Sequence, residues 1–292
     1  MKLSYFPGCT LKNYGKNFED AALCALKRLD VEVEELKRWN CCGTVFSLSS
    51  DDLIHHVAPV RNLIRTKELE SNKLMTMCAM CFNTLKRTNE RMKNNPEDLD
   101  IINDLMYREN IKYEGDVEVV HLLEVLKNDI TFEKIAPKVQ KPLQNLKVAN
   151  YYGCYLVRPE EIGFDDSENP TILEDLATVL GATPVDFPYK VECCGAYQTV
   201  DKPEVVADRT NQILTSALNL GAELVAVSCP LCAFNLDHRQ KETLALYPEF
   251  KSIPVVYFTQ LLAIALGCPE ESLRLDLHYI DPKPVLQGKG FI

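Results

Sequence analysis

Residues 73–81 read Lys-Leu-Met-Thr-Met-Cys-Ala-Met-Cys, an apolar run that leads straight into a Cys-x-x-Cys motif, and residues 223–232 read Glu-Leu-Val-Ala-Val-Ser-Cys-Pro-Leu-Cys. Each motif closes a longer pattern: a lone cysteine, then Cys-Cys-Gly, then Cys-x-x-Cys, in the same order and at nearly the same spacing. Ten of the twelve cysteines belong to these two copies, which are Cys9, Cys41, Cys42, Cys78 and Cys81, and Cys154, Cys193, Cys194, Cys229 and Cys232. The chain is therefore an internal duplication.

Short apolar runs alternate with helical patterns in both halves. In the first half the runs at 3–6, 31–36, 73–77 and 117–120 predict strands, and the segments between them carry apolar residues at helical spacing. The second half repeats this order. The sequence predicts an α/β fold of two pseudo-symmetric Rossmann-like halves with parallel sheets, each carrying one CCG cysteine motif. Because the carboxyl ends of parallel strands share one edge, where ligands gather, we expect the cysteines to meet there.

The seam between the halves is expected in the polar stretch 138–146, which contains Pro142. We therefore expect two domains, residues 1–144 and residues 145–292, each carrying one CCG cysteine set. The tail from Asp281 contains two prolines and two glycines and is expected to be extended and to lie over a surface.

Composition narrows the class of protein. The 292 residues are 46% hydrophobic and 25% charged, as in soluble globular proteins, and no apolar run approaches the ~18 residues of a membrane-spanning helix or resembles a signal peptide. We expect a cytoplasmic protein without membrane insertion, where thiols stay reduced and a disulfide framework is excluded. The net charge of −10 argues against nucleic acid as a partner.

Metal ligation is the remaining use for so many thiols. Adjacent cysteines such as Cys41 and Cys42 cannot easily chelate one tetrahedral ion together, but they can serve neighbouring irons, which favours a multinuclear site. A structural zinc site takes four ligands and would leave one cysteine idle in each half. A thiol-disulfide relay through the Cys-x-x-Cys motifs would leave the lone cysteines and the pairs unexplained. The sequence holds no ferredoxin-type cysteine run, so electrons would come from a partner.

The motif Tyr5-Phe-Pro-Gly-Cys9, the two Cys-Cys-Gly elements and the two Cys-x-x-Cys elements resemble the B subunit of CoB-CoM heterodisulfide reductase over essentially the whole chain. The resemblance implies an oxidoreductase subunit with two noncubane [4Fe-4S] clusters, each held by one five-cysteine set, that reduce a disulfide between them. It implies as partners a ferredoxin protein like the reductase's C subunit, a flavoprotein like its A subunit, and leaves open a larger bifurcating complex. Residues 43–47, Gly-Thr-Val-Phe-Ser, resemble the bacterial versions, so the disulfide stays undefined.

Two-fold packing of the sheet edges would place a cleft between the clusters, lined by Gly43, Thr44 and Val45 and by Gly195, Ala196 and Tyr197. Three other functions remain open. The chain could pass electrons to another protein without a substrate of its own, serve as the CCG subunit of a lactate or glycolate oxidoreductase, or be a zinc-stabilised scaffold.

Several residues outside the repeat are expected to be structural. Cys24 lies on an apolar helix face and predicts a buried, inert thiol, and Cys268 stands outside the repeat. His121 could reach the ligand edge, but a satisfied structural histidine is favoured. Trp39 and Tyr152 are expected to screen the nearby cysteines from water.

Overall fold

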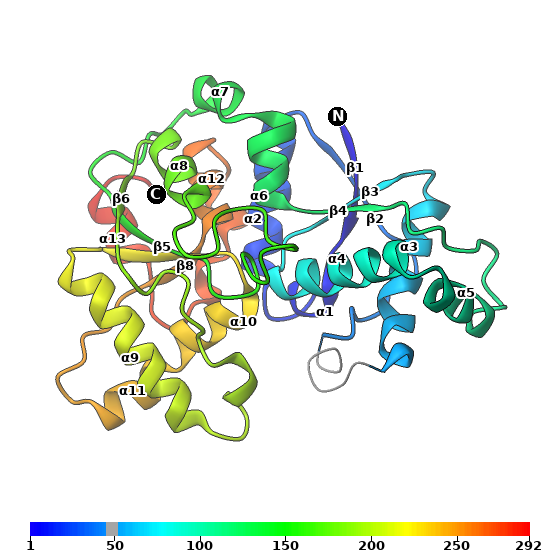
Figure 1. Ribbon diagram of the computed structural model, residues 1–292. Coiled ribbons are helices and arrows are strands. Elements are labelled where there is room, and N and C mark those ends of the chain that lie inside the picture. The colour runs from blue at the N-terminus through cyan, green and yellow to red at the C-terminus, as the bar shows by residue number, and fades with distance from the viewer. Residues whose placement is uncertain (45–51) are drawn as a thin grey trace.

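The computed structural model describes residues 1–44 and 52–292, and Val45 of the predicted cleft lies outside them. Two four-stranded parallel sheets form the described part (Figure 1). The first has the order β2-β1-β3-β4 and the second has the matching order β6-β5-β7-β8. The strands are β1 (Lys2–Phe6), β2 (Glu32–Glu35), β3 (Lys73–Thr76), β4 (Glu118–His121), β5 (Lys147–Tyr151), β6 (Thr183–Val185), β7 (Leu224–Val227) and β8 (Val255–Tyr257). The predicted α/β fold with two pseudo-symmetric halves is confirmed.

Helices connect the strands and cover the sheets. In the first half they are α1 (Gly8–Leu11), α2 (Lys16–Arg28), η1 (Leu53–His56), α3 (Val57–Glu68), α4 (Ala79–Asn94), α5 (Pro96–Leu105), α6 (Leu122–Glu124), η2 (Val125–Ile130), α7 (Phe132–Ile135) and η3 (Ala136–Lys138). In the second half they are α8 (Ile172–Val179), η4 (Ala196–Gln198), α9 (Pro203–Asn219), α10 (Pro230–Ala233), η5 (Phe234–His238), α11 (Gln240–Leu246), α12 (Phe258–Ala265), η6 (Glu270–Leu273), η7 (Leu275–Leu277) and α13 (Lys283–Gly288).

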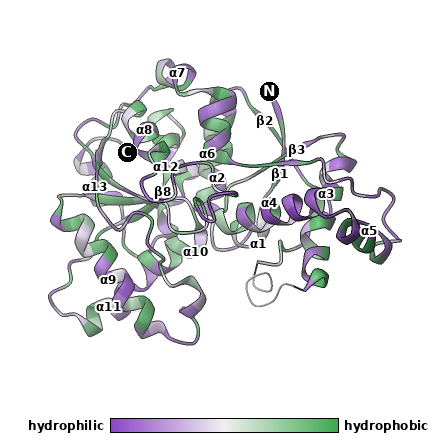
Figure 2. Ribbon diagram, in the orientation of Figure 1, coloured by the Kyte–Doolittle hydropathy of each residue, from purple (hydrophilic) through white to green (hydrophobic). Residues whose placement is uncertain are grey.

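Burial explains why these segments fold as they do. All four residues of β7 are buried, as expected for a central strand covered on both faces. Helices at the outside, such as α9 and α11, carry hydrophilic and hydrophobic stretches side by side (Figure 2), so one face of each can pack inward. No helix among the described residues is long and apolar enough to cross a membrane.

The two halves pack through α2 of the first half and α12 of the second. Phe18 of α2 is fully buried and stacks on Tyr257 with ring centroids 4.4 Å apart, and Phe258 meets its edge at 5.6 Å. The Thr259 hydroxyl donates to the Phe18 carbonyl at 3.0 Å. Full burial of one Phe side chain contributes about 1.5–3 kcal/mol. The halves are thus joined by a dry aromatic seam.

Cys24 and Cys268 correct the expectation made for them. Cys24 on α2 is half-buried, and its sulfur lies in disulfide contact with that of Cys268, which follows α12, with the Cα atoms 6.3 Å apart. That Cα separation suits a disulfide. The two residues are 244 positions apart, so no local pattern indicates the pairing. Cys24 is therefore part of an inter-half pair rather than an isolated thiol.

The pair makes a measurable prediction. Oxidation of the protein with oxidised glutathione is expected to yield a cross-linked peptide containing Cys24 and Cys268, visible by mass spectrometry after alkylation under denaturing conditions. The oxidised protein is expected to resist urea unfolding by about 2–4 kcal/mol more than the Cys24→Ser, Cys268→Ser double variant, because the bond restricts the unfolded chain. Full alkylation of both residues after oxidation would contradict the pairing.

The tail differs from the extended segment that was expected. Residues 283–288 form α13, and Leu286 and Phe291 are buried against the second half. These two apolar side chains are the physical reason, because burying them requires a defined local conformation.

Candidate metal centre

The ten repeat cysteines all follow carboxyl ends of strands. Cys9 lies in α1 directly after β1, and Cys78 caps the amino end of α4 directly after β3. In the second half the loop after β5 carries Cys154, and Cys229 caps α10 after β7. The two adjacent pairs lie in the loops that follow β2 and β6. The parallel topology therefore brings each set to one sheet edge, as the sequence predicted.

Burial within each set follows the same pattern. The second cysteine of each adjacent pair and both cysteines of each Cys-x-x-Cys motif are buried. The lone cysteines and the first cysteine of each pair are more open, with Cys9, Cys41 and Cys193 exposed and Cys154 half-buried. Each five-cysteine set therefore extends from the buried core to the protein surface.

Glycines at equivalent places let the backbone approach these thiols. Gly8 and Gly153, which precede the lone cysteines, both have a positive φ, +72° and +68°. A Cβ atom at Gly8 would lie 2.9 Å from the Cys81 sulfur, and one at Gly153 would lie 3.1 Å from the Cys232 sulfur. A side chain at Gly8 would overlap a thiol and one at Gly153 would crowd a thiol, and the positive φ at both positions favours glycine as well.

Gly43 and Gly195 serve a different purpose. Both have a positive φ, and their N–H groups donate to the sulfurs of Cys41 and Cys193 at 3.5 and 3.3 Å. Hydrogen bonds to sulfur tune the potential of thiolate-bound iron. A Cβ at Gly195 would point at Val206 of α9, 3.3 Å away, and not into a cavity.

The thiols of the first set shift one another's pKa in an unbroken series. Cys9 interacts with Cys41, Cys41 with Cys42, Cys42 with Cys81, and Cys81 with Cys78. The Cys41 and Cys81 thiols lower the pKa of Cys42 well below its ordinary value, whereas Cys42 and Cys78 raise the pKa of Cys81. All five thiols of the set are thus electrostatically coupled.

The second set is linked in two parts. The sulfurs of Cys194 and Cys232 lie 3.5 Å apart, and Cys232 also bonds Cys229. Cys154 bonds Cys193 and, as the largest cause, lowers the pKa of that thiol to about 6. The Gly195 and Ala196 N–H groups lower it further, and burial opposes the shift.

The two sets also touch each other. The Cys78 thiol of the first half lies near enough to the Cys229 thiol of the second to raise the pKa of Cys78. The pKa of Cys229 is lowered chiefly by Cys232 and further by Cys78. Cys78 and Cys229 hold equivalent positions in the two halves, so the thiol-bearing sheet edges approach one another at this pair.

These donors fit iron-sulfur ligation. Iron-sulfur clusters are held by deprotonated thiols, and every member of both sets supplies sulfur. No group of three or more His, Cys, Asp or Glu side chains in residues 1–44 and 52–292 has the arrangement that a single metal ion requires.

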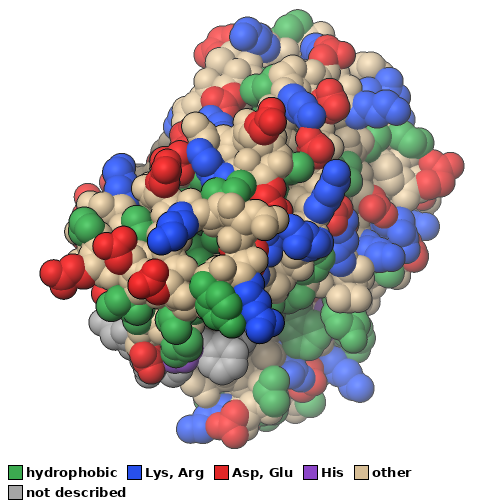
Figure 3. All heavy atoms as spheres, turned by 90° about the vertical axis from the view of Figure 1, so that its right-hand side faces the viewer, with side chains coloured by type: hydrophobic (Ala, Val, Ile, Leu, Met, Phe, Trp, Pro, Cys, Tyr) green, Lys and Arg blue, Asp and Glu red, His purple; other side chains and the backbone are tan. Residues whose placement is uncertain are grey.

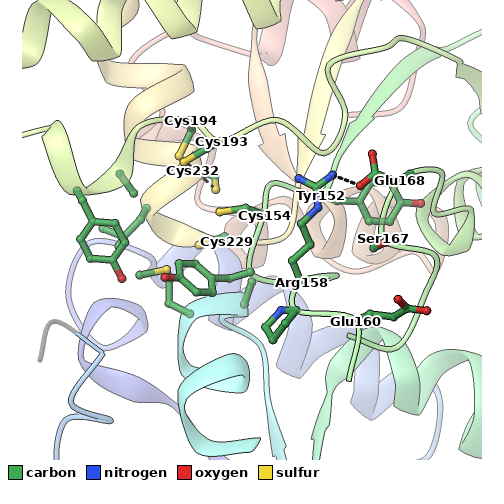
Figure 4. Close-up of a pocket in the computed structure, with 17 residues that line it drawn as sticks. Tyr152, Cys154, Arg158, Glu160, Ser167, Glu168, Cys193, Cys194, Cys229 and Cys232 are labelled. Atoms are coloured by element: carbon green, nitrogen blue, oxygen red, sulfur yellow. Dashed lines mark hydrogen bonds and ion pairs between the residues drawn. The ribbon is translucent and has the colours of Figure 1, made fainter. Parts of the chain in front are cut away.

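A cavity of about 630 Å³ opens beside the second set. Figure 4 shows its cysteines toward one end and Arg158, Ser167 and Glu168 toward the other. The Arg158 guanidinium is paired with the Glu168 carboxylate at 2.8 Å. The first half contributes Ala79 and Met80, the residues inside its Cys-x-x-Cys motif.

Of the predicted cleft residues, Ala196 and Tyr197 line this cavity, whereas Gly43, Thr44 and Gly195 do not. Thr44 still reaches it indirectly, because its side chain hydrogen-bonds that of Tyr197, which also bonds Tyr155. The rings of Tyr155 and Tyr197 meet edge to face at 6.4 Å. Sequence reasoning missed Tyr155 and Arg158; the only signal was that Tyr155 directly follows Cys154.

The predicted structural residues behave as follows. His121 is fully buried, bonds the Met77 carbonyl through Nε2 at 2.7 Å and accepts the Leu123 N–H at Nδ1, so it is satisfied as predicted. Burial lowers its pKa to about 4, which keeps it neutral. Tyr152 is buried and lines the cavity, whereas Trp39 packs edge to face on Phe6 at 5.9 Å.

The fold and the paired thiol sets define a duplicated cysteine-rich α/β protein. The chain belongs to the Cysteine-rich domain family (CCG), whose pattern matches residues 3–86 and 148–237.

Among its relatives is the 8-methylmenaquinol:fumarate reductase membrane anchor subunit of Wolinella succinogenes, 32% identical over 96% of this chain and 97% of the relative. Another is the B subunit of the ferredoxin/F(420)H(2)-dependent CoB-CoM heterodisulfide reductase of Methanosarcina acetivorans, 30% identical over 96% of this chain and 94% of the relative. The resemblance to the B subunit of heterodisulfide reductase is therefore confirmed. A hypothetical protein from Helicobacter pylori shares the fold, with a TM-score of 0.73 at 15% identity over 95% of this chain and 51% of that one.

Proposed function

We propose that this protein is the iron-sulfur subunit of a heterodisulfide-reductase-like complex and reduces a disulfide. The observation that carries the proposal is the close approach of two equivalent five-thiol sets at Cys78 and Cys229, with a cavity of about 630 Å³ beside the second set. Reduction of a disulfide to two thiols consumes two electrons and two protons. Two equivalent redox sites that approach one another, one of them lining the cavity, suit a two-electron reaction supplied one electron at a time.

The ten repeat cysteines would hold two noncubane [4Fe-4S] clusters, one in residues 1–144 and one in residues 145–292. When bound, such clusters store and deliver single electrons. The chain itself contributes the dry surroundings of the buried thiols and the N–H donors of Gly43 and Gly195. Tyr155 and Tyr197 place hydroxyl groups at the cavity wall, where they can donate hydrogen bonds to a bound sulfur compound.

Electrons are proposed to arrive from a ferredoxin protein like the C subunit of heterodisulfide reductase. That protein would in turn be reduced by a flavoprotein like the A subunit. The proposed complex is cytoplasmic and can be part of a larger bifurcating assembly. The support is that two relatives are named as the B subunit of such reductases, and that this sequence lacks any ferredoxin-type cysteine run. On the face in Figure 3, Lys and Arg side chains are interspersed with Asp and Glu. That mixed surface suits a protein partner better than a nucleic acid.

Partner dependence is the test of this proposal. The isolated, iron-loaded protein is expected to show no reduction by NADH or reduced flavin within minutes, and full reduction when a ferredoxin-type donor protein is added, followed by the visible absorbance. The control is titanium(III) citrate, which needs no docking and is expected to reduce the protein in both cases. Rapid reduction by NADH alone would contradict the proposed electron path.

A second candidate function is electron exchange with a quinol. The relative from Wolinella succinogenes carries 8-methylmenaquinol in its name and matches nearly the full length of both chains. A second, largely apolar cavity in this protein favours the same chemistry. Thiol release from a disulfide and reduction of a quinone, both measured on the same preparation, distinguish the two functions.

A further inference from the structure

A second cavity of about 330 Å³ lies between the two halves, close to α1 and α10 near the centre of Figure 1. Thr10, Tyr14 and Asn17 line it from the first half. Leu231, inside the Cys229-Pro-Leu-Cys232 motif, lines both this cavity and the larger one, so it forms the wall between them. Thr10 directly follows Cys9. The second cavity therefore adjoins the thiol edges of both halves.

Aromatic rings make up much of its wall. Phe234 and His238 stack with centroids 5.1 Å apart, and the rings of Tyr257 and His278 lie 6.4 Å apart. Tyr257 is held from behind by the stacked ring of Phe18. Flat, supported walls of this kind suit another flat ring, because offset stacking adds to the gain from burial.

The charged groups of the cavity are already engaged. The Asp237 carboxylate accepts the N–H groups of Tyr279 and Ile280 at 2.7 and 3.0 Å. The Arg239 guanidinium pairs with Glu242 at 2.8 Å. Among the described lining residues no Lys and no other Arg is present, so the permanent positive charge that an anionic ligand would meet is that of Arg239, which Glu242 already pairs.

Neutral polar groups complete the lining. The His278 side chain is 3% exposed, this burial lowers its pKa to about 4, and its Nε2 lies 3.2 Å from the Asn17 amide nitrogen. The hydroxyl groups of Thr10 and Thr199 are further neutral groups of the wall. Hydroxyl and amide groups suit the carbonyl oxygens of a ligand.

We propose that the second cavity is a binding site for an uncharged, planar ring of the quinone class. Its function as an electron-exchange site rests on the quinol candidate above, whereas the binding itself rests on the cavity alone. The site is distinct from the larger cavity, in which the disulfide is proposed to bind.

The test is equilibrium dialysis of the anaerobic, iron-loaded protein with 2,3-dimethyl-1,4-naphthoquinone, which has no free quinone-ring position for thiols to attack. We expect saturable binding of one ring per chain. 2-Naphthalenesulfonate, a planar ring with a negative charge, is expected to bind at least about tenfold more weakly. Equal binding of the two probes, or no saturable binding of the naphthoquinone, would overturn the proposal.

Variants locate the site. Phe234→Ala removes part of the wall and is expected to weaken naphthoquinone binding about tenfold. Leu244→Ala is the matched control, because Leu244 is 40% exposed and Phe234 is 39% exposed, and Leu244 does not line the cavity. Ala233→Phe is expected to abolish binding by placing a phenyl ring in the cavity, whereas Ala196→Phe places one in the larger cavity and is expected to leave binding unchanged.

Loss of binding in Ala196→Phe with retention in Phe234→Ala would place the ring in the larger cavity and overturn the assignment. Iron and sulfide content and disulfide turnover are measured on the same preparations. If the naphthoquinone fails to bind while those two stay intact, the cavity assignment fails and the proposed disulfide reduction stands. If disulfide turnover is absent while the naphthoquinone binds, the proposed disulfide reduction fails and the cavity assignment stands.

Discussion

Anaerobically prepared protein is expected to contain about eight iron and eight sulfide per chain, the content of two four-iron clusters, with little zinc. Cys42→Ala and Cys194→Ala are each expected to remove about half of both, because each replaces a buried thiol at the same position of one set. The buried neighbours Cys81 and Cys232 would lose a sulfur partner at the same time. Iron and acid-labile sulfide analysis with an EPR spectrum of each variant is the measurement.

Cys24→Ser is the matched control for this experiment. Cys24 is also a cysteine of the first half, but it pairs with Cys268 at the seam and stands outside both thiol sets. We expect this variant to keep the full iron and sulfide content. Stoichiometric zinc without sulfide in the unmodified protein, or equal loss of iron in all three variants, would remove the basis for two clusters.

Filling the larger cavity is expected to lower disulfide turnover at least about a hundredfold, because displacement of a reacting group by an ångström can cost that much. Ala196→Phe is the variant of choice, since Ala196 lines the cavity. Thiol release from hydroxyethyl disulfide, with titanium(III) citrate as the electron source, is the measurement. Reduction of the protein itself by titanium(III) citrate is expected to stay unchanged.

A substitution at Gly195 would be a poorer test of the cavity than Ala196→Phe. A larger residue there would meet Val206 and strain a backbone with φ +77°, so a loss of turnover would report local misfolding rather than blockage of the cavity. Ala233→Phe, which narrows the second cavity, serves as the control for added bulk near a thiol. If Ala196→Phe turns over the disulfide at the unmodified rate, the larger cavity is not the reaction site and a purely electron-transferring role gains support.

Patterns of residues that are close in sequence were sufficient to predict the fold of this protein and the sheet edge at which its thiols lie. Strand-like runs that end in cysteines predicted both parallel sheets and the edge at which thiols gather, because strand direction fixes which ends coincide. The glycines before Cys9 and Cys154 belong to the same local pattern, and the short distance from a Cβ there to the Cys81 or Cys232 sulfur supplies the physical reason for them. These features depend on residues that are near in sequence or related by the repeat.

The remaining features depend on how distant segments pack. The Cys24 and Cys268 pair, the contact of Cys78 with Cys229 and the wall that Leu231 forms between two cavities all join the halves. Nothing in the local pattern of either half encodes them. The direction in which a Cβ added at Gly195 would point likewise depends on where α9 packs.

The way the halves pair has an evolutionary consequence. The α2 helix follows the first strand of its half and packs closely against α12, which directly follows the last strand of the other half. In the opposite direction α8 makes a smaller contact with α7, which lies beyond α6 and η2 after the last strand of the first half. The two copies of the repeat therefore pack unequally, because copies joined in one chain can change independently. Two features show this difference between the copies. The pair of Cys24 and Cys268 has no counterpart formed by the equivalent positions, and most residues that line the two cavities belong to the second copy.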